Sequence, residues 1–405
     1  MAALLVACVP SRYAALLAAL PSGRSGVLGG DRTYGGEHQA GTEYSPAGRV
    51  VGEPGLVADR QDKRVSLTFG LALPHYGFSF PDSGPDSGAD LARVLQVASQ
   101  AEALGFDEGW VSDHLFLSLA RYGGPSDRRE SLEAWATMAA VAASTTRLRV
   151  GSLVLCQAFR PPSLLAKMAA TLDVASGGRL DLGLGAGWYE EEFAALGIPF
   201  ERPGVRLAQL EEALGVIAAM FERSPASFEG RFYRVEGAHN EPKPLQVPRP
   251  PLWVGGKGDR LLGVVARAAD GWNFCWRFTE ETFRDRLAVL ARACEAAGRD
   301  PVGVRLSAGQ YTLIGESQAD LEARYVRLQA WAPGGSLDGV PLEQFAEGAL
   351  VGTAEQITER LESLAALGVE HVICSFAPVP FAIHDLDQLE MFASLVIRPL
   401  RSGTR

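Results

Sequence analysis

The sequence has few lysines, few cysteines and no long apolar run. Only four of its 38 basic residues are lysines, and 48 acidic residues give a net charge of −10. This balance offers no positive field for nucleic acid or for an anionic membrane. No apolar stretch reaches the roughly 18 residues that a membrane-spanning helix requires. We therefore expect neither a nucleic-acid partner nor a membrane partner.

The five cysteines are too scattered to predict a disulfide framework or a metal site. Cys8, Cys156, Cys275, Cys294 and Cys374 form no CxxC pair and no Cys/His ligand spacing. We expect no bound metal and a reducing, cytoplasmic setting. Since no activating base lies near them in the sequence, we interpret the cysteines near strand ends as small buried residues and not as nucleophiles.

Residues 1–64 lack the regular pattern of the remaining chain. The opening apolar stretch has no positively charged start, and Pro10 and Arg12 interrupt it, which argues against a signal peptide. The stretch that follows is rich in Gly, Arg and Glu and has no period. We interpret residues 1–64 as a disordered leader or an over-called start site, and residues 65–405 as one domain.

From residue 65 onward, short apolar runs alternate with amphipathic segments, which is typical of repeated βα units and a parallel sheet. Eight such units in a chain of this length favour a (β/α)8 TIM barrel over a doubly wound sheet. Insertions at 223–250 and 331–349 are expected to form lids over the C-terminal mouth of the barrel. The expected strands are 65–74, 105–114, 148–156, 179–185, 251–256, 270–276, 303–315 and 369–376.

A glycine-rich segment, RLDLGLGAGW at 179–188, raises the question of a dinucleotide fingerprint. Its glycines are spaced GxGxG, and Trp188 stands where the fingerprint has its third glycine. The alternation instead sends the leucines to one face and Asp181, Gly183 and Gly185 to the other. We expect these glycines to face the barrel mouth and to leave room for a flat ring system.

Three segments carry a resemblance that covers roughly residues 66–400. They are GFDEGWVSDHLF, RLRVGSLVLCQAFRPPSLLAKMAATLDVASGGRLDLGLGAGWYEEEFAALGIPF and PPLWVGGKGDRLLGVVARAADGWN. Together they resemble the luciferase-like barrel oxidoreductases, and most of all the branch that uses the deazaflavin coenzyme F420. The resemblance implies a homodimeric (β/α)8 barrel that binds the deazaflavin at its C-terminal mouth. There the cofactor exchanges a hydride with a small-molecule substrate.

The resemblance also implies which residues form the site. Asp113 and the catalytic residue His114 end the second strand. A bulge behind the deazaflavin ring, often with a non-prolyl cis peptide, maps onto Leu153 and Val154, with Cys156 close by. The other implied cofactor-binding residues are Gly185, Ala186, Gly187 and Glu191 after the fourth strand, and Gly255, Gly256, Lys257 and Gly258 in a phosphate loop.

The residues themselves support two of these assignments. An imidazole at a strand end, such as His114, can exchange the proton that accompanies hydride transfer, although SDH (112–114) also suits a turn cap. In VGGKGDR (254–260), glycine amides, a helix start and the charge of Lys257 can bind a phosphate, although the same sequence suits an ordinary turn.

Other polar positions are weaker candidates. His75 and Trp188 are expected at the mouth as substrate contacts, and the acidic run 190–192 is interpreted as a solvated helix start. Ser118 and Trp188 replace a Trp and a Glu of the relatives that oxidise sugar phosphates, which argues against that substrate. Since FMN also needs a phosphate loop, two alternatives stay open: a reduced-FMN-dependent monooxygenase and a flavin-binding protein without catalysis.

Overall fold

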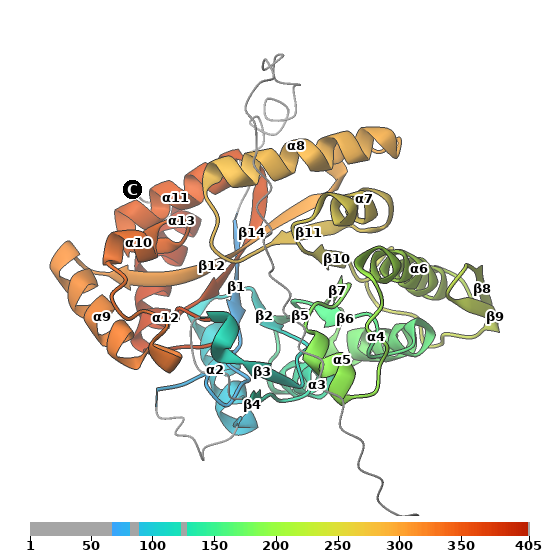
Figure 1. The fold of residues 1–405 in the computed structure, drawn as a ribbon, viewed down its shortest axis with the longest axis horizontal. Coiled ribbons are helices and arrows are strands. Elements are labelled where there is room, and N and C mark those ends of the chain that lie inside the picture. The colour runs from blue at the N-terminus through green and yellow to red at the C-terminus, as the bar shows by residue number, and fades with distance from the viewer. Residues whose placement is uncertain (1–66, 82–88, 123–127, 404–405) are drawn as a thin grey trace, which may run out of the picture. The chain divides into compact units, whose positions relative to one another are not determined.

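The computed structural model describes residues 67–81, 89–122 and 128–403. The leader predicted for residues 1–64 lies outside these ranges. In the described part, eight parallel strands pair in the order β1, β2, β5, β7, β10, β11, β12, β14 and back to β1 (Figure 1). The ring is closed and helices surround it, which confirms the predicted (β/α)8 barrel.

Each barrel strand lies within one of the eight predicted segments. They are β1 (Thr68–Ala72), β2 (Glu108–Val111), β5 (Arg149–Ser152), β7 (Leu180–Gly185), β10 (Leu252–Gly255), β11 (Gly271–Phe274), β12 (Arg305–Gly315) and β14 (Val369–Ser375). The third predicted strand, 148–156, is divided. After β5 the peptide bond between Leu153 and Val154 is cis, and pairing with β7 resumes at β6 (Leu155–Cys156).

The helices cover the outside of the ring, where the leucines and valines of the strands are buried. Local signals set their ends: α2, for example, begins at Asp90, whose carboxylate accepts from two backbone amides, and ends at Gly105 in the left-handed conformation. The helices are α2 (Leu91–Leu104), α3 (Ala134–Ser144), α4 (Pro162–Ser176), α5 (Glu190–Ala195), α6 (Pro203–Glu222), α7 (Asp259–Ala268), α8 (Glu280–Ala296), α9 (Gln318–Trp331), α10 (Leu342–Ala346), α11 (Ala354–Ala366), α12 (Asp387–Phe392) and α13 (Arg398–Ser402). No helix in these ranges is long and apolar enough to cross a membrane.

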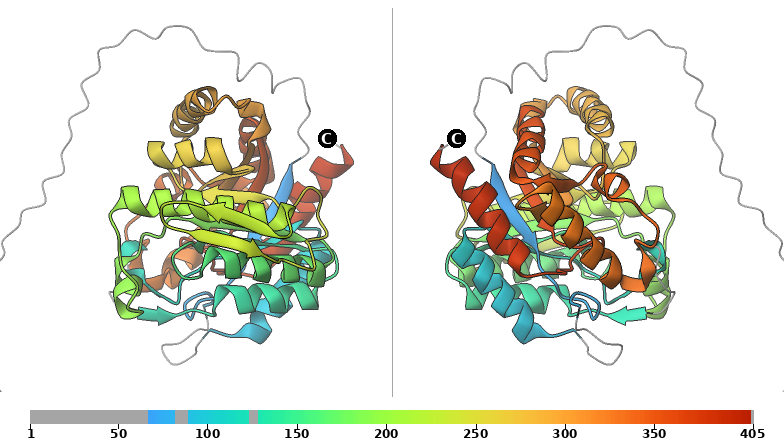
Figure 2. Two further views of the ribbon diagram at one scale, coloured as in Figure 1. Left: turned by 90° about the vertical axis from the view of Figure 1, so that its right-hand side faces the viewer. Right: turned by 90° about the vertical axis from the view of Figure 1, so that its left-hand side faces the viewer.

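The two insertions do not form the expected lids. In the first, strands β8 (Ala226–Glu229) and β9 (Arg234–Ala238) form a hairpin that packs against α6 (Figure 2). The second, which contains α10, packs against α9 in a separate apolar cluster around Tyr325 and Phe345. Neither insertion contributes a described residue to the cavity at the barrel mouth. The expectation is wrong because each insertion finds apolar surface on the outside of the barrel.

The alternation along β7 is as predicted. Leu180, Leu182 and Leu184 are fully buried in the core outside the ring, and Asp181 points into the ring. The space over the β7 glycines, however, is taken by Val154: a Cβ on Gly185 would lie 2.6 Å from a Val154 methyl. The glycines therefore make room for the bulged segment 153–154, and not directly for a ring system.

We expect Gly183→Ala to lower the free energy of unfolding by ~1–3 kcal/mol, as overpacked sites do. A Cβ at this position would lie 2.0 Å from the backbone oxygen of Ser152, so the paired strands would have to separate. Denaturant unfolding measures the change. The control is Gly204→Ala on α6, where the nearest atom, 3.5 Å away, is the end of the flexible Arg260 side chain. Equal stability of the two variants would contradict the prediction.

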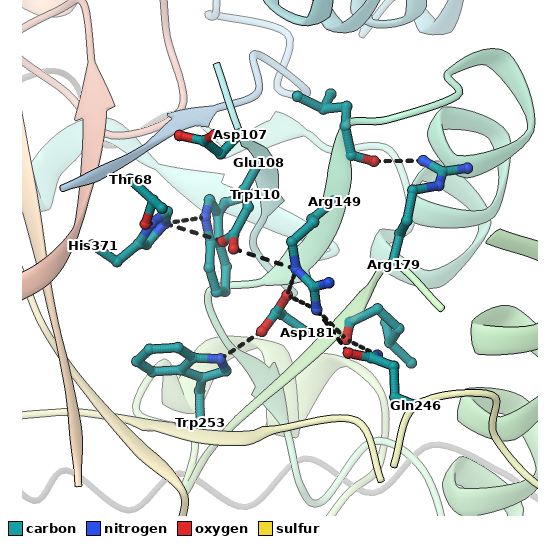
Figure 3. A network of polar contacts seen from close by, with 12 residues as sticks. Thr68, Asp107, Glu108, Trp110, Arg149, Arg179, Asp181, Gln246, Trp253 and His371 are labelled. Carbon is teal, nitrogen blue, oxygen red and sulfur yellow. Dashed lines mark hydrogen bonds and ion pairs between the residues drawn. The ribbon is translucent and has the colours of Figure 1, made fainter. Parts of the chain in front are cut away.

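The N-terminal end of the barrel interior is filled by a charged network (Figure 3). Arg149 donates to Asp181 at 2.6 Å and lies 3.5 Å from Glu108. Glu108 in turn lies 3.1 Å from His371, whose Nδ1 is 2.7 Å from the Thr68 hydroxyl. Most of these groups are buried, so each ion needs its partner in order to remain charged.

Two tryptophans separate this network from the barrel mouth. Trp110 and Trp253 are buried edge to face, with ring centroids 6.2 Å apart. Their indole N–H groups donate into the network, to His371 at 3.0 Å and to Asp181 at 2.9 Å. Along β2 the inward side chains are therefore Glu108 in the network, then Trp110, and then Ser112 at the mouth. This layering gives the mouth a solid floor.

Candidate active site

A cavity of about 440 Å³ opens at the C-terminal mouth of the barrel. Its volume is that of a small-molecule site, and most of its lining is apolar or aromatic. The lining comes from the loops after β1, β2, β5, β7, β10, β11 and β14. The lining residues include Tyr76, Ser112, Asp113, His114, Leu117, Tyr122, Leu153, Val154, Leu155, Cys156, Gly185, Ala186, Gly187, Trp188, Tyr189, Glu192, Gly255, Gly256, Cys275, Trp276 and Phe381.

His114 is paired with a carboxylate that the sequence did not reveal. Its Nδ1 lies 2.7 Å from Oε2 of Glu192, whose side chain is only 2% exposed. The other oxygen of Glu192 accepts from the backbone N–H of Leu115 at 2.6 Å. The interpretation of 190–192 as a solvated run is therefore wrong for Glu192: this residue, beside the buried Phe193, turns inward at the first turn of α5.

Asp113 holds the end of β2 in place. Its carboxylate accepts from the backbone N–H of Cys156 at 2.9 Å and from both terminal nitrogens of Arg160, at 2.7 and 3.0 Å. Arg160 also pairs with Glu133. Both oxygens of Asp113 thus have protein partners, and the pair with Arg160 connects β2 to the segment after β6. This connection fixes the backbone from which His114 projects.

The bulged segment after β5 forms one wall of the cavity. Leu153, Val154 and Leu155 all line it, and the cis peptide bond lies between the first two. Val154 packs over Gly185 and Gly255, so the ends of β5, β7 and β10 meet at one side of the mouth. These three segments contain residues that the family resemblance implied for the C-terminal mouth of the barrel.

Only part of the predicted phosphate loop lies in the cavity, and the remainder lies at the surface. Gly255 and Gly256 line the cavity, whereas Lys257 and Gly258 do not. Lys257 donates to the backbone oxygen of Trp276 at 3.2 Å, so its charge lies beside the loop after β11. Gly258 precedes α7, and no side chain caps that helix start. Its first amides are available to an anion.

Two other predicted residues lie outside the cavity lining. Glu191 is exposed and accepts from the Tyr189 hydroxyl at 3.1 Å, next to the inward-facing Glu192. His75 is fully buried behind the lining, and burial lowers its pKa to about 4. Trp188 does line the cavity; it is 42% exposed, and its ring centroid lies 5.1 Å from that of His114.

The cysteines at the mouth are thiols at neutral pH. Burial raises the pKa of both Cys156 and Cys275 to about 12. They are therefore not poised as nucleophiles. In the residues the structure covers, no group of His, Cys, Asp and Glu side chains is arranged to hold a metal ion.

Residues 68–371 match the family model of the luciferase-like monooxygenases. This match spans most of the sequence, and the chain belongs to the luciferase-like monooxygenase family. A solved structure shares the fold: an F420-dependent secondary alcohol dehydrogenase, solved with an F420–acetone adduct, superposes with a TM-score of 0.64 over 82% of this chain and 98% of that one, at 20% identity.

Curated relatives include enzymes with each of two cofactors. The FMNH2-dependent dimethylsulfone monooxygenase of Pseudomonas putida is 25% identical over 339 residues, which are 77% of this chain and 88% of that protein. The F420-dependent hydroxymycolic acid dehydrogenase of Mycobacterium tuberculosis is 30% identical over 232 residues, which are 57% of this chain and 61% of that protein. The family membership supports an enzyme that uses a flavin or a deazaflavin.

Proposed function

We propose that this chain is an F420-dependent oxidoreductase that transfers a hydride between the deazaflavin and a small organic substrate. The observation that carries the proposal is the pair of His114 and Glu192 in a mostly apolar cavity. Hydride exchange with an alcohol or carbonyl compound requires one proton to move, and a positioned imidazole is the usual group for that task. When bound, the deazaflavin supplies the hydride acceptor or donor.

The hydrogen bond to Glu192 decides which nitrogen of His114 exchanges the proton. An ionised carboxylate only accepts, so Nδ1 of the neutral ring carries its proton toward Glu192. Nε2 is then the nitrogen that takes a proton from the substrate as the hydride leaves, and returns it in the reverse reaction. Asp113 and Arg160 fix the backbone of His114, so the ring keeps its position.

The residues at the mouth fit a planar heterocycle. The wall of Leu153, Val154 and Leu155 is apolar, and it meets the backbone of Gly185 and Gly255 at the end of the barrel. The uncapped start of α7 lies after the same loop and suits a phosphate. These residues would hold the ring and the phosphate of the cofactor, with Asp113, Cys156, Ala186 and Gly187 around them.

Separate titrations with F420 and with FMN test the cofactor. We expect saturable F420 binding, seen as a change in the fluorescence of F420. In a screen of alcohols, we expect a substrate-dependent loss of the visible absorbance of oxidised F420. With aldehydes, enones or nitroaromatics, we expect this absorbance to return when reduced F420 is supplied. Binding of FMN without binding of F420 would overturn the proposal. Binding without turnover of any substrate would support a flavin-binding protein without catalysis.

The second candidate is a reduced-FMN-dependent monooxygenase. The longer alignment, 339 residues against 232, is to a protein of that type, which favours this reading. It predicts substrate-dependent oxygen consumption when reduced FMN is supplied. Oxygen consumption of this kind, without hydride exchange through F420, would replace the first proposal. The homodimer and the cytoplasmic location implied above stay predictions, and light scattering measures the first.

A further inference from the structure

A chain of hydrogen bonds leads from the wall of the cavity into the interior behind β1 and β2. The Tyr76 hydroxyl lies 2.5 Å from Oγ of Ser112, and Oγ of Ser112 lies 3.1 Å from Nε2 of His75. Nδ1 of His75 lies 2.8 Å from the backbone oxygen of Leu73. Tyr76 and Ser112 line the cavity, whereas His75 lies behind them. The proposed hydride transfer uses none of these side chains.

The contact between His75 and the carbonyl of Leu73 decides which group donates in each hydrogen bond of this series. Each ring nitrogen of His75 faces a backbone carbonyl, which only accepts: Nδ1 faces that of Leu73 at 2.8 Å, and Nε2 faces that of Ser112 at 3.1 Å. The shorter contact places the proton on Nδ1. Since burial lowers the pKa of His75 to about 4, the ring is neutral and has only this one N–H. Nε2 is therefore an acceptor. Both oxygens of Ser112 lie 3.1 Å from it, and only the hydroxyl has a proton to donate.

The direction of the hydrogen bond between Tyr76 and Ser112 follows from the same argument. The proton of Ser112 is directed at His75, so Oγ of Ser112 accepts the proton of the Tyr76 hydroxyl at 2.5 Å. Burial raises the pKa of Tyr76 well above its usual range, which keeps the phenol protonated. Its single proton is committed to Ser112. The Tyr76 oxygen therefore offers a ligand in the cavity a lone pair and no donor.

The surroundings of Tyr76 keep its oxygen in this place. Its ring stacks on Phe78, with centroids 4.8 Å apart and planes 8° apart. Its backbone N–H donates to Oγ of Ser79 at 2.9 Å, and that hydroxyl donates to the backbone oxygen of Phe381 at 2.7 Å. Rotation of the phenol away from Ser112 would disrupt buried packing on both sides.

We propose that Tyr76 is a specificity residue that accepts a hydrogen bond from the substrate, with Ser112 and His75 as positioning residues behind it. The cavity then selects ligands that present an O–H or N–H donor to this wall over ligands with only carbonyl or ether oxygens. The inference rests on the proposed function in taking this cavity as the substrate site. Because His114 also faces the substrate with an unprotonated nitrogen, the substrate class is an alcohol with a second hydroxyl or N–H donor.

Binding of two inert probes to the full-length chain tests this assignment. Pinacol has two hydroxyl donors, and pinacolone, a ketone of similar shape, has none. Neither carbinol carbon of pinacol carries a hydrogen, so neither can lose a hydride, and the measurement is independent of turnover and of the cofactor. We expect Tyr76→Phe to weaken pinacol binding ~3–10-fold, the usual effect of one lost hydrogen bond, and to leave pinacolone binding nearly unchanged.

Ser112→Ala is the converse experiment. It removes the acceptor of the Tyr76 proton, so the phenol turns its O–H toward the cavity. We expect pinacolone to bind ~3–10-fold more tightly, by the same hydrogen bond. A purely structural role for Ser112 would change both affinities in the same direction, which would overturn the proposal. So would an unchanged pinacol affinity in Tyr76→Phe, or no saturable binding of pinacol to the unaltered chain.

The tautomer of His75 gives a test that needs no variant. Nitrogen NMR of the unaltered chain distinguishes a protonated ring nitrogen from a bare one. We expect a protonated Nδ1 and a bare Nε2, and a protonated Nε2 would overturn the proposal even if Ser112→Ala fails to fold. Failure of hydride transfer with F420, in contrast, would contradict the proposed function, and the binding of the two probes would still test the role of Tyr76.

Discussion

Replacing His114 by alanine is expected to lower kcat for hydride transfer ~10²–10⁴-fold, the range that positioned proton-transfer groups contribute. The variant loses the only imidazole among the described lining residues of the cavity. Cofactor binding should change little, because the apolar wall of Leu153 and Val154 remains. Steady-state turnover and a cofactor titration of the same preparation separate the two quantities.

Two further variants make this result specific. His239→Ala removes an exposed histidine beside β9 that is not among the described lining residues, and it is expected to leave kcat unchanged. Glu192→Gln keeps the shape of the side chain but removes the carboxylate from Nδ1 of His114, and should give an intermediate loss. Full turnover in His114→Ala would show that the proton moves by another group or through water.

The strands of the barrel were readable from the sequence because they are buried on both faces. Parallel strands of this kind form short apolar runs between glycine and proline signals, and all eight runs contain a strand. The interruption at 153–154 was not visible as periodicity. It came only from the family resemblance, because the bulge depends on Val154 packing over glycines of two other strands.

The partner of His114 was missed because burial of one glutamate among three is a tertiary property. Glu190, Glu191 and Glu192 all stand in the first turn of α5, and each suits the helix dipole equally. Only the placement of α5 over the end of β2, 78 residues away in sequence, brings Glu192 to His114. No local pattern distinguishes it from its neighbours.

Tyr76 lines the cavity and His75 lies behind it, although only His75 was predicted as a substrate contact. Inward side chains of β1 have even numbers: a Cβ on Gly70 would meet the Trp110 ring inside the barrel, and Ala72 packs in the same inner cluster. Continuing that alternation beyond the strand end selects Tyr76 for the cavity and turns His75 away from it. The prediction for His75 rested on its residue type and its place at the strand end, and not on this alternation.

Arg149→Met is expected to lower the free energy of unfolding by ~3–5 kcal/mol, the cost of removing one member of a buried ion pair. The side chains of Asp181 and Glu108, which lie next to Arg149 in Figure 3, are 1% and 5% exposed, so removing the guanidinium takes the cation away from two buried carboxylates. Methionine keeps much of the aliphatic length, which limits the change to charge and hydrogen bonding. Chemical denaturation at a fixed pH measures the loss.

The loss should depend on pH through Asp181. Burial raises the pKa of this carboxyl to about 6 in the folded chain, above its value of about 4 when unfolded. A folded chain that binds more protons loses stability as the pH rises between the two values. Removing Arg149 raises the folded pKa further, because a cation that favoured the carboxylate is gone. Protonation then relieves the buried charge, so the loss should be smaller at pH 5 than at pH 8.

Arg267→Met is the matched control, since Arg267 pairs with Glu211 on the surface, with side chains 51% and 34% exposed. An exposed pair of this kind contributes at most about 1 kcal/mol, and neither partner changes its hydration much when the other is removed. Two results would show that ion pairing does not stabilise the network beneath Trp110 and Trp253. One is a loss of unfolding free energy in Arg149→Met no larger than in this control, and the other is a larger loss at pH 5 than at pH 8. The floor of the cavity would then rest on the packing of the two indoles alone.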